Sequence, residues 1–307
     1  MQNLSQQIRQ LAREKNAVIL AHYYTEGAVQ DIADFVGDSL ALAQKAAQTD
    51  ADVIVMCGVH FMGETCKILC PDKTVLSPDP TATCSLAESC PADEFAAFVK
   101  AHPDHKVISY VNTSAATKAV TDVVVTSSNA RHIVESFPAD QPLIFGPDHN
   151  LGSYLNSVTG RQMLLWNGCC HVHQRFSLQA LQTLKAEHPD APVLVHPECP
   201  ADIVAMADVV GSTAALLKYA TASDAEEFLV VTESGILHEM QQKAPGKHFI
   251  PVPSTEGPGC NTCNYMRQIT LPKLRDCLLH GAPAIEVDAA VAAKALKPIR
   301  RMLELSK

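Results

Sequence analysis

Short apolar runs alternate with polar, helix-forming stretches along the chain, and three of these runs end in an aromatic or imidazole side chain. The runs span 18–22, 107–110 and 193–196 and end at His22, Tyr110 and His196, which lie 88 and 86 positions apart. Apolar strands that alternate with helical stretches predict βαβ units around parallel sheets.

Further landmarks keep the same spacing after each strand end. An aspartate follows twelve residues later (Asp34, Asp122, Asp208), and a hydroxyl residue follows five residues after that (Ser39, Ser127, Thr213). A third apolar run closes nineteen residues beyond each hydroxyl, at Gly58, Gly146 and Thr232. Equal offsets in three copies indicate an internal repeat of strand, helix, short strand, helix and strand.

A repeat of this length exceeds the roughly 20–50 residues of a solenoid unit, so each copy predicts a small domain. We expect an α/β protein with three similar αβα sandwich domains around a pseudo-threefold axis. The predicted domains span 1–85, 86–171 and 172–267, with 268–307 packing back on the first. Ligands of open parallel sheets bind at the carboxyl ends of the strands, so the three strand-end residues should converge on one central site.

The hydroxyl residues Ser39, Ser127 and Thr213 precede helical stretches, where we expect them to cap helix N-termini. Helix N-termini carry partial positive charge and free N–H donors. Three of them facing one axis predict a small ligand with two or more anionic groups.

Composition and charge narrow the function classes. The 307 residues are 47% hydrophobic and 19% charged, which excludes a disordered or low-complexity chain. A net charge of −9 without a basic run argues against nucleic acid or an acidic membrane as a partner. The N-terminus lacks the pattern of a signal peptide and no apolar stretch approaches a membrane span, so we expect a cytoplasmic protein.

Eleven cysteines are an odd number, which argues against a disulfide framework. One cysteine follows the last strand of each repeat by 26, 24 or 31 positions, namely Cys84, Cys170 and Cys263. One thiolate per domain around an axis fits a [4Fe–4S] cluster with one open iron. On spacing alone, zinc or no metal are alternatives. Five other cysteines are expected to be structural: Cys57, Cys66, Cys70, Cys199 and Cys277.

Polar residues two positions beyond the strand ends are candidates for acid–base chemistry and binding. His196 and Glu198 can face the same cavity because side chains alternate, and Tyr24 and Asn112 take the equivalent position in the other repeats. Five histidines without such a partner are expected at the surface or behind the site lining: His60, His149, His171, His173 and His238.

Several longer motifs resemble those of the quinolinate synthase family, an iron–sulfur enzyme family of NAD biosynthesis. They are LAHYY at 20–24, VQDIAD at 29–34 with GDS at 37–39, YVNTSA at 110–115, HPE at 196–198, GST at 211–213 and CNYM at 263–266. The resemblance covers nearly the whole chain and implies three αβα domains and a [4Fe–4S] cluster on Cys84, Cys170 and Cys263.

The resemblance also implies the reaction and the site. A transferase of this family condenses iminoaspartate with dihydroxyacetone phosphate to quinolinate, phosphate and two waters, and is linked in function to the aspartate oxidase or dehydrogenase that supplies iminoaspartate. Catalytic roles would fall on Tyr24, Tyr110, His196 and Glu198. Substrate binding would involve His22, Ser39, Tyr110, Asn112, Ser127, His196, Glu198, Ser212 and Thr213.

The chain departs from family members that carry a longer CxxCxxC motif, because Gly257 occupies the first cysteine position. Cys260 is then the remaining partner for a redox pair with Cys263, and we expect Cys263 to be the ligand. Two other function classes stay open: another [4Fe–4S] hydro-lyase acting on a small polyanion, and a non-enzyme such as an electron carrier or a zinc-stabilised binding protein.

Overall fold

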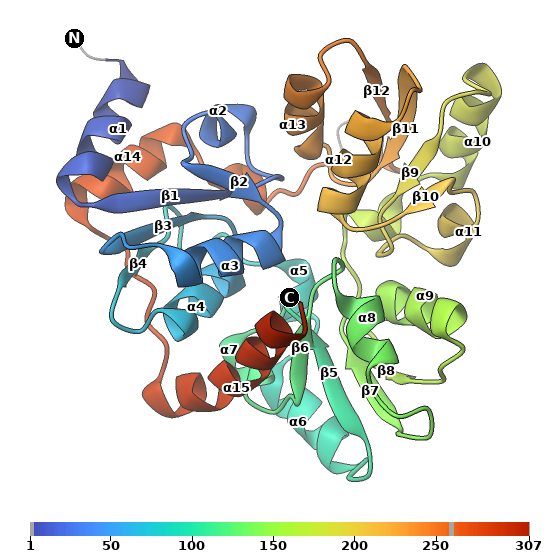
Figure 1. The fold of residues 1–307 in the computed structure, drawn as a ribbon, viewed down its shortest axis with the longest axis horizontal. Helices are drawn as coiled ribbons and strands as arrows, with labels where there is room; N and C mark the ends of the chain where they lie inside the picture. Colours follow the sequence, from blue (N-terminus) through green and yellow to red (C-terminus); the bar gives the residue numbers. More distant parts are fainter. Residues whose placement is uncertain (1–2, 258–260, 307) are drawn as a thin grey trace.

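The computed structural model describes residues 3–257 and 261–306, which form three units of the same architecture around a common centre (Figure 1). Each unit contains one parallel four-stranded sheet, and the strand orders β2-β1-β3-β4, β6-β5-β7-β8 and β10-β9-β11-β12 are the same. The α/β class and the three αβα units predicted from the repeat are confirmed.

The strands follow the repeat, with one strand more per unit than the sequence pattern predicts. The first sheet contains β1 (Ala17–His22), β2 (Phe35–Gly37), β3 (Val53–Cys57) and β4 (Thr74–Leu76). The second contains β5 (Lys106–Tyr110), β6 (Val123–Val125), β7 (Leu143–Gly146) and β8 (Leu164–Leu165). The third contains β9 (Val193–Val195), β10 (Val209–Val210), β11 (Glu227–Val231) and β12 (His248–Pro251). The additional strands β4, β8 and β12 are short edge strands, so they leave little apolar pattern.

Helices connect the strands and cover both faces of each sheet (Figure 1). The first unit carries α1 (Leu4–Glu14), α2 (Gly27–Gln30), α3 (Ser39–Gln48), α4 (His60–Leu69) and α5 (Ser85–Glu88). The second carries α6 (Ala92–Lys100), α7 (Ala115–Lys118), α8 (Ala130–Glu135) and α9 (His149–Thr159). The third carries α10 (Leu178–Glu187), α11 (Ala201–Val204), α12 (Thr213–Ala222) and α13 (Ile236–Lys243), preceded by the 3₁₀ turn η1 (His173–Arg175). The chain closes with η2 (Met266–Gln268), α14 (Leu271–His280) and α15 (Ala289–Leu305).

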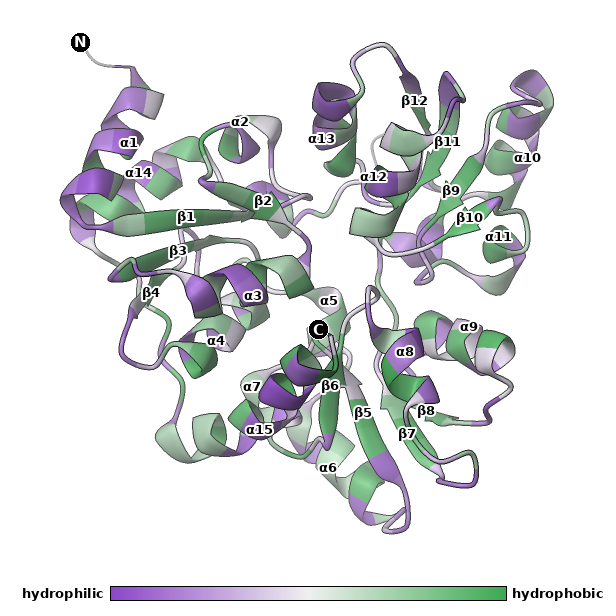
Figure 2. Ribbon diagram, viewed as in Figure 1, coloured by the Kyte–Doolittle hydropathy of each residue, from purple (hydrophilic) through white to green (hydrophobic). Residues whose placement is uncertain are grey.

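Alternation along the first strand of each sheet builds two apolar layers. Val18 and Leu20 of β1 belong to the core that contains residues of α3 and α4, whereas Ile19 and Ala21 belong to the core shared with α1 and α14. Hydrophobic residues accordingly concentrate in the strands and on the inner helix faces, and polar residues on the outer faces (Figure 2). Strands buried on both faces read as continuous apolar runs, as the sequence showed.

The repeated aspartates have a structural role. The carboxylates of Asp34, Asp122 and Asp208 each accept a hydrogen bond over 2.8 Å from a backbone N–H of the first strand in their unit, donated by Ile19, Val107 and Val193. Each aspartate therefore fixes the entry of the second strand beside the first.

The C-terminal segment contacts two units. Helix α14 packs on α1, and α15 packs on α4 of the first unit and on α7 and β6 of the second. The domain boundaries given above remain a prediction. None of the helices in the described ranges is both long and apolar enough to cross a membrane.

Candidate active site

A central cavity lies where the three units meet, and its free volume is about 660 Å³ when its opening to solvent is included. Its lining includes twelve of the predicted site residues: His22, Tyr24, Ser39, Cys84, Tyr110, Asn112, Ser127, Cys170, His196, Glu198, Thr213 and Cys263. Ser212 is not among the lining residues. His22 and Tyr110 end β1 and β5, and His196 directly follows β9, so the carboxyl ends of the parallel strands converge as the repeat predicts.

The two strand-end imidazoles have a defined proton arrangement. Nδ1 of His22 accepts the backbone N–H of Tyr24 over 3.2 Å, and Nδ1 of His196 accepts that of Glu198 over 3.4 Å. Burial lowers the pKa of both rings to about 3, against the opposing effect of Glu198. Both rings are therefore neutral near pH 7, with the proton on Nε2.

Two chains of hydrogen bonds end on the buried carboxylate of Glu198. In the first, Nε2 of His196 lies 3.2 Å from Oγ of Ser127, Ser127 approaches the Tyr110 hydroxyl, and this hydroxyl donates to Oε1 of Glu198 over 2.6 Å. Because Nδ1 of His196 is already an acceptor, the donors in this chain all point toward Glu198.

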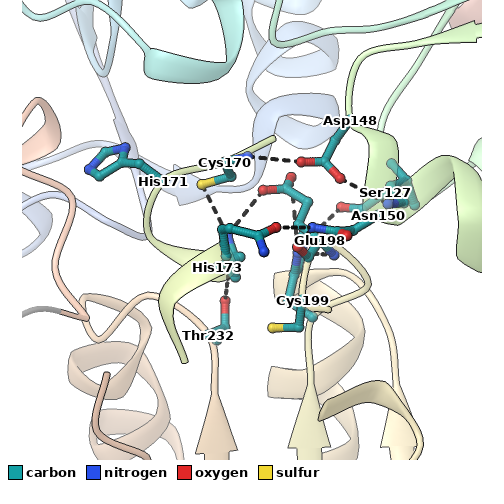
Figure 3. Close-up of polar contacts among 12 residues, drawn as sticks. Ser127, Asp148, Asn150, Cys170, His171, His173, Glu198, Cys199 and Thr232 are labelled. Carbon is teal, nitrogen blue, oxygen red and sulfur yellow. Dashed lines mark hydrogen bonds and ion pairs between the residues drawn. The ribbon is translucent and has the colours of Figure 1, made fainter. Parts of the chain in front are cut away.

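The second chain reaches Glu198 through Thr232 and His173 (Figure 3). The Tyr24 hydroxyl lies 3.0 Å from Oγ1 of Thr232 and 2.7 Å from Oγ1 of Thr213. Thr232 Oγ1 lies 2.9 Å from Nε2 of His173, whose Nδ1 lies 3.0 Å from Oε2 of Glu198. An ionised carboxylate only accepts, so Nδ1 of His173 donates to Glu198.

The carboxyl of Glu198 and the phenols of Tyr24 and Tyr110 have pKa values that are shifted in opposite directions. Burial acts to raise the pKa of Glu198, but His196, His173 and the hydroxyl of Tyr110 outweigh it and lower the pKa to about 2. Burial, reinforced by Glu198, raises the pKa of Tyr110 and of Tyr24 well above the usual range. At neutral pH Glu198 is therefore a carboxylate, whereas Tyr24 and Tyr110 are protonated phenols.

The placement of His173 corrects the expectation for that residue. His173 is buried and lines the cavity, with Nδ1 3.2 Å from Sγ of Cys170 as well as beside Glu198. It belongs to the irregular turn η1, where no strand or helix period signals burial. The spacing Cys170-x-x-His173 could have indicated this position, because a short turn brings two residues that are three positions apart close together.

The capping prediction for the hydroxyls is wrong by one position in the first and third units and by two positions in the second. Asp38 and Ser212 are the N-caps of α3 and α12, accepting from the N–H of Ala41 and Ala215, and Ser39 and Thr213 are the first helical residues. Residue 129, rather than Ser127, is the N-cap of α8. Ser212 and Asp38 are joined through Oγ of Ser128, at 2.8 and 2.6 Å, which links the three units at the cavity, where Asp38 belongs to the lining.

The three predicted ligand cysteines come from different parts of the chain and line the same cavity. Burial raises the pKa of the Cys84 thiol to about 12 and of Cys263 to about 11, and raises that of Cys170 strongly. Backbone N–H groups two or three residues downstream approach each sulfur and oppose this effect: Leu86 and Ala87, His173, and Tyr265 and Met266. Such donors stabilise thiolate, the form that binds metal, so the donor set fits an iron–sulfur group.

Two buried acids hold the backbone of Cys170 and Cys263, and no sequence motif predicts them. Asp148 accepts the N–H of Cys170 over 2.9 Å (Figure 3), and Glu233 accepts that of Cys263 over 3.0 Å. Asp148 also caps α9 by accepting from Leu151. Both acids follow the third strand of their unit, at positions that are not equivalent in the repeat.

The remaining cysteines have the expected places. Cys57, Cys66, Cys70, Cys199 and Cys277 are buried. Cys169 is partly exposed and does not line the cavity, unlike Cys170. Cys260 lies outside the described residues, so its relation to Cys263 remains a prediction.

Comparison with known proteins agrees with this geometry. The profile of the family described as Quinolinate synthetase A protein (NadA) matches residues 6–304. A protein of Thermosynechococcus vestitus named quinolinate synthase is 56% identical over 97% of this chain and 94% of its own length. One of Chloroherpeton thalassium with the same name is 54% identical over 99% of this chain and 95% of its own length. The chain therefore belongs to the quinolinate synthetase A (NadA) family.

Proposed function

We propose that this chain is a quinolinate synthase of the transferase class. It condenses iminoaspartate with dihydroxyacetone phosphate and releases quinolinate, phosphate and two waters, with a [4Fe–4S] cluster held by Cys84, Cys170 and Cys263. Family membership supports the reaction. The single observation that carries the site assignment is that Tyr110 and His173 both bond to Glu198, while Nδ1 of His173 also lies 3.2 Å from Sγ of Cys170.

Cys84, Cys170 and Cys263 do not together form a compact single-ion site among the described residues, which favours a cluster over a single zinc ion on these three cysteines. Among residues 3–257 and 261–306, the one group of three ligand atoms that all lie within 4.8 Å of one another is Cys170, His173 and Glu198, without Cys84 or Cys263. With Zn–S bonds of about 2.3 Å, two sulfurs on one zinc are at most about 4.6 Å apart. A multi-iron group accommodates the wider spacing. When bound, a cluster with one iron free of protein ligands supplies a Lewis acid that assists dehydration.

The protein groups divide into a base and a set of donors. Glu198 is the ionised group of the acid–base set, and we assign it the role of general base. An anionic substrate in the cavity would raise the pKa of this carboxylate from its low value toward the working range. The protonated phenol of Tyr24 and the Nε2–H of His22 donate to oxygen atoms of the substrates. The Tyr110 hydroxyl donates to Glu198 and so orients the base.

The anionic groups of the substrates need neutral donors. Asn112, Ser39, Ser127 and Thr213 line the cavity, and we assign them to the carboxylates or the phosphate. Helices α3 and α12 direct their N-termini there, although the Asp38 carboxylate already accepts from the first turn of α3. An anion is therefore better placed at the α12 end, beside Thr213.

The assay is performed anaerobically on protein whose three iron-ligand cysteines are intact and whose iron and sulfide have been measured. Iminoaspartate, generated from oxaloacetate and ammonia, is supplied with dihydroxyacetone phosphate, and quinolinate is measured by chromatography. Quinolinate in amounts exceeding the protein supports the proposal. Absence of quinolinate with a full cluster contradicts it and favours a hydro-lyase acting on another polyanion.

The need for iminoaspartate also supports the proposed functional partner, which is the enzyme that supplies this imine. Imines hydrolyse in water, so the supplying enzyme must oxidise aspartate close to where the imine is used. An aspartate oxidase or dehydrogenase fits this requirement.

A further inference from the structure

The fourth residue of a short helix occupies an equivalent position in all three units and is a buried polar donor in two of them. Helices α2, α7 and α11 have four residues each and end at Gln30, Lys118 and Val204. These three positions keep the 88- and 86-residue offsets of the repeat. Gln30 is 3% exposed and Lys118 is fully buried.

Both donors bind the loop that carries the cavity residues of their unit. Nε2 of Gln30 donates to the carbonyls of Tyr23 and Thr25 over 2.9 Å each. Nζ of Lys118 donates to the carbonyls of Val111, over 2.8 Å, and Thr113. The two carbonyls flank Tyr24 in the first unit and Asn112 in the second.

In the third unit, the equivalent loop is held by a side chain of another unit. Val204 has no donor, and the loop after His196 is instead held by Asn150 of α9, whose Nδ2 donates to the carbonyl of Glu198 over 3.0 Å (Figure 3). Each of the three cavity loops thus has one side-chain amide or ammonium group that fixes its backbone.

The structure assigns Lys118 the role of a positioning residue, which holds the 110–113 loop so that Tyr110 and Asn112 meet the substrates. The assignment rests on the proposed function. No carboxylate pairs with Nζ within hydrogen-bond distance among the described residues; the ammonium group instead lies 5.3 Å from the ring centroid of Phe61. Burying a lysine is costly, so a lysine whose bonds go to this loop points to a positional requirement.

The chain supplies both a conservative replacement and a matched control. Gln30 does the same work with an amide, so Lys118→Gln keeps a donor and Lys118→Met removes it. Nζ of Lys247 likewise donates to two carbonyls, those of Ala220 and Ser223, and lies 5.4 Å from the centroid of Phe228. Lys247 does not line the central cavity, so Lys247→Met controls for general loss of stability.

The test compares the four cluster-loaded proteins at a temperature well below their melting points. We expect Lys118→Met to lower kcat/KM for quinolinate formation at least tenfold and to accelerate amide hydrogen exchange in 110–114 at least tenfold. Lys118→Gln should stay within threefold of the parent in both, and Lys247→Met should leave both unchanged.

The outcomes that overturn the assignment are separate from those that overturn the function. The role of Lys118 is refuted if Lys118→Met leaves amide exchange or kcat/KM unchanged. It is also refuted if Lys118→Gln shows losses equal to those of Lys118→Met, or if both Lys118 variants fail to fold. A parent protein that makes no quinolinate refutes the proposed function instead, and the exchange comparison still decides whether Lys118 fixes the loop.

Discussion

The hydroxyl of Tyr110 donates to Oε1 of Glu198 over 2.6 Å, a contact between the end of β5 in the second unit and the loop after β9 in the third. Both residues are buried. A hydrogen bond to an ionised group is among the stronger contacts in proteins, so this pair fixes two units relative to each other at the central cavity. In the proposed function, the catalytic geometry and the packing of the units therefore depend on the same contact.

The acid–base assignment predicts a loss of turnover without a loss of the cluster. Glu198→Gln removes the base, and Tyr110→Phe removes its donor while keeping the ring. We expect kcat to fall about 10²–10⁴-fold in Glu198→Gln, as for other positioned acid–base groups, with iron and sulfide content equal to the parent. Turnover within a few-fold of the parent would demote Glu198 to a structural role.

The ligand assignment predicts that Cys84→Ala, Cys170→Ala and Cys263→Ala each lose the cluster and the activity. Cys169→Ala is the matched control, because Cys169 adjoins Cys170 in the chain and does not line the cavity. Iron and sulfide are measured after anaerobic reconstitution. A full cluster in any of the three variants, or its loss in Cys169→Ala, would show that the ligands are wrongly assigned.

Cys260 and Cys263 are expected to differ in the same assay. Cys260→Ser should keep the cluster and most of the anaerobic activity, whereas Cys263→Ser should lose both. Equal losses in the two variants, or loss in Cys260→Ser alone, would move the ligand to Cys260.

Asp148 should matter for cluster retention beyond its contribution to stability. Asp148→Ala removes the N-cap of α9 and the acceptor for the Cys170 N–H. Asp288→Ala removes only an N-cap, that of α15. Both should cost about 0.5–2 kcal/mol of stability, and only Asp148→Ala should release iron faster in the presence of a chelator. Equal release rates would contradict the role of Asp148 at Cys170.

The pattern of residues predicts the repeat, the strand ends and the three cysteines, because each depends on spacing that the fold preserves. It does not predict His173, which lies in an irregular turn, or Asp148 and Glu233, whose partners are backbone groups distant in sequence. It places the helix caps at Ser39 and Thr213, one residue late, because capping depends on the backbone conformation of a single residue. Contacts made across units have no signal in local periodicity.

Lys118 predicts a pH dependence of stability. Burial lowers its pKa to about 8 from 10.5, with Glu64 and Cys84 acting in the opposite direction. Between these values the unfolded chain binds more protons than the folded one, so this lysine makes stability rise with pH, by at most about 1.4 kcal/mol per pH unit. The melting temperature of the parent relative to Lys118→Met should therefore increase from pH 8 to pH 10. A constant difference would show that the ammonium group is not perturbed.

The fate of the carbon atoms of dihydroxyacetone phosphate tests the central claim most directly. The cluster-loaded protein is incubated anaerobically with iminoaspartate and dihydroxyacetone phosphate labelled with ¹³C at all three carbons, and quinolinate is examined by mass spectrometry. The condensation predicts quinolinate carrying three labelled carbons, formed by the parent and not by Cys84→Ala. Unlabelled quinolinate, or none from protein with a full cluster, would contradict the account.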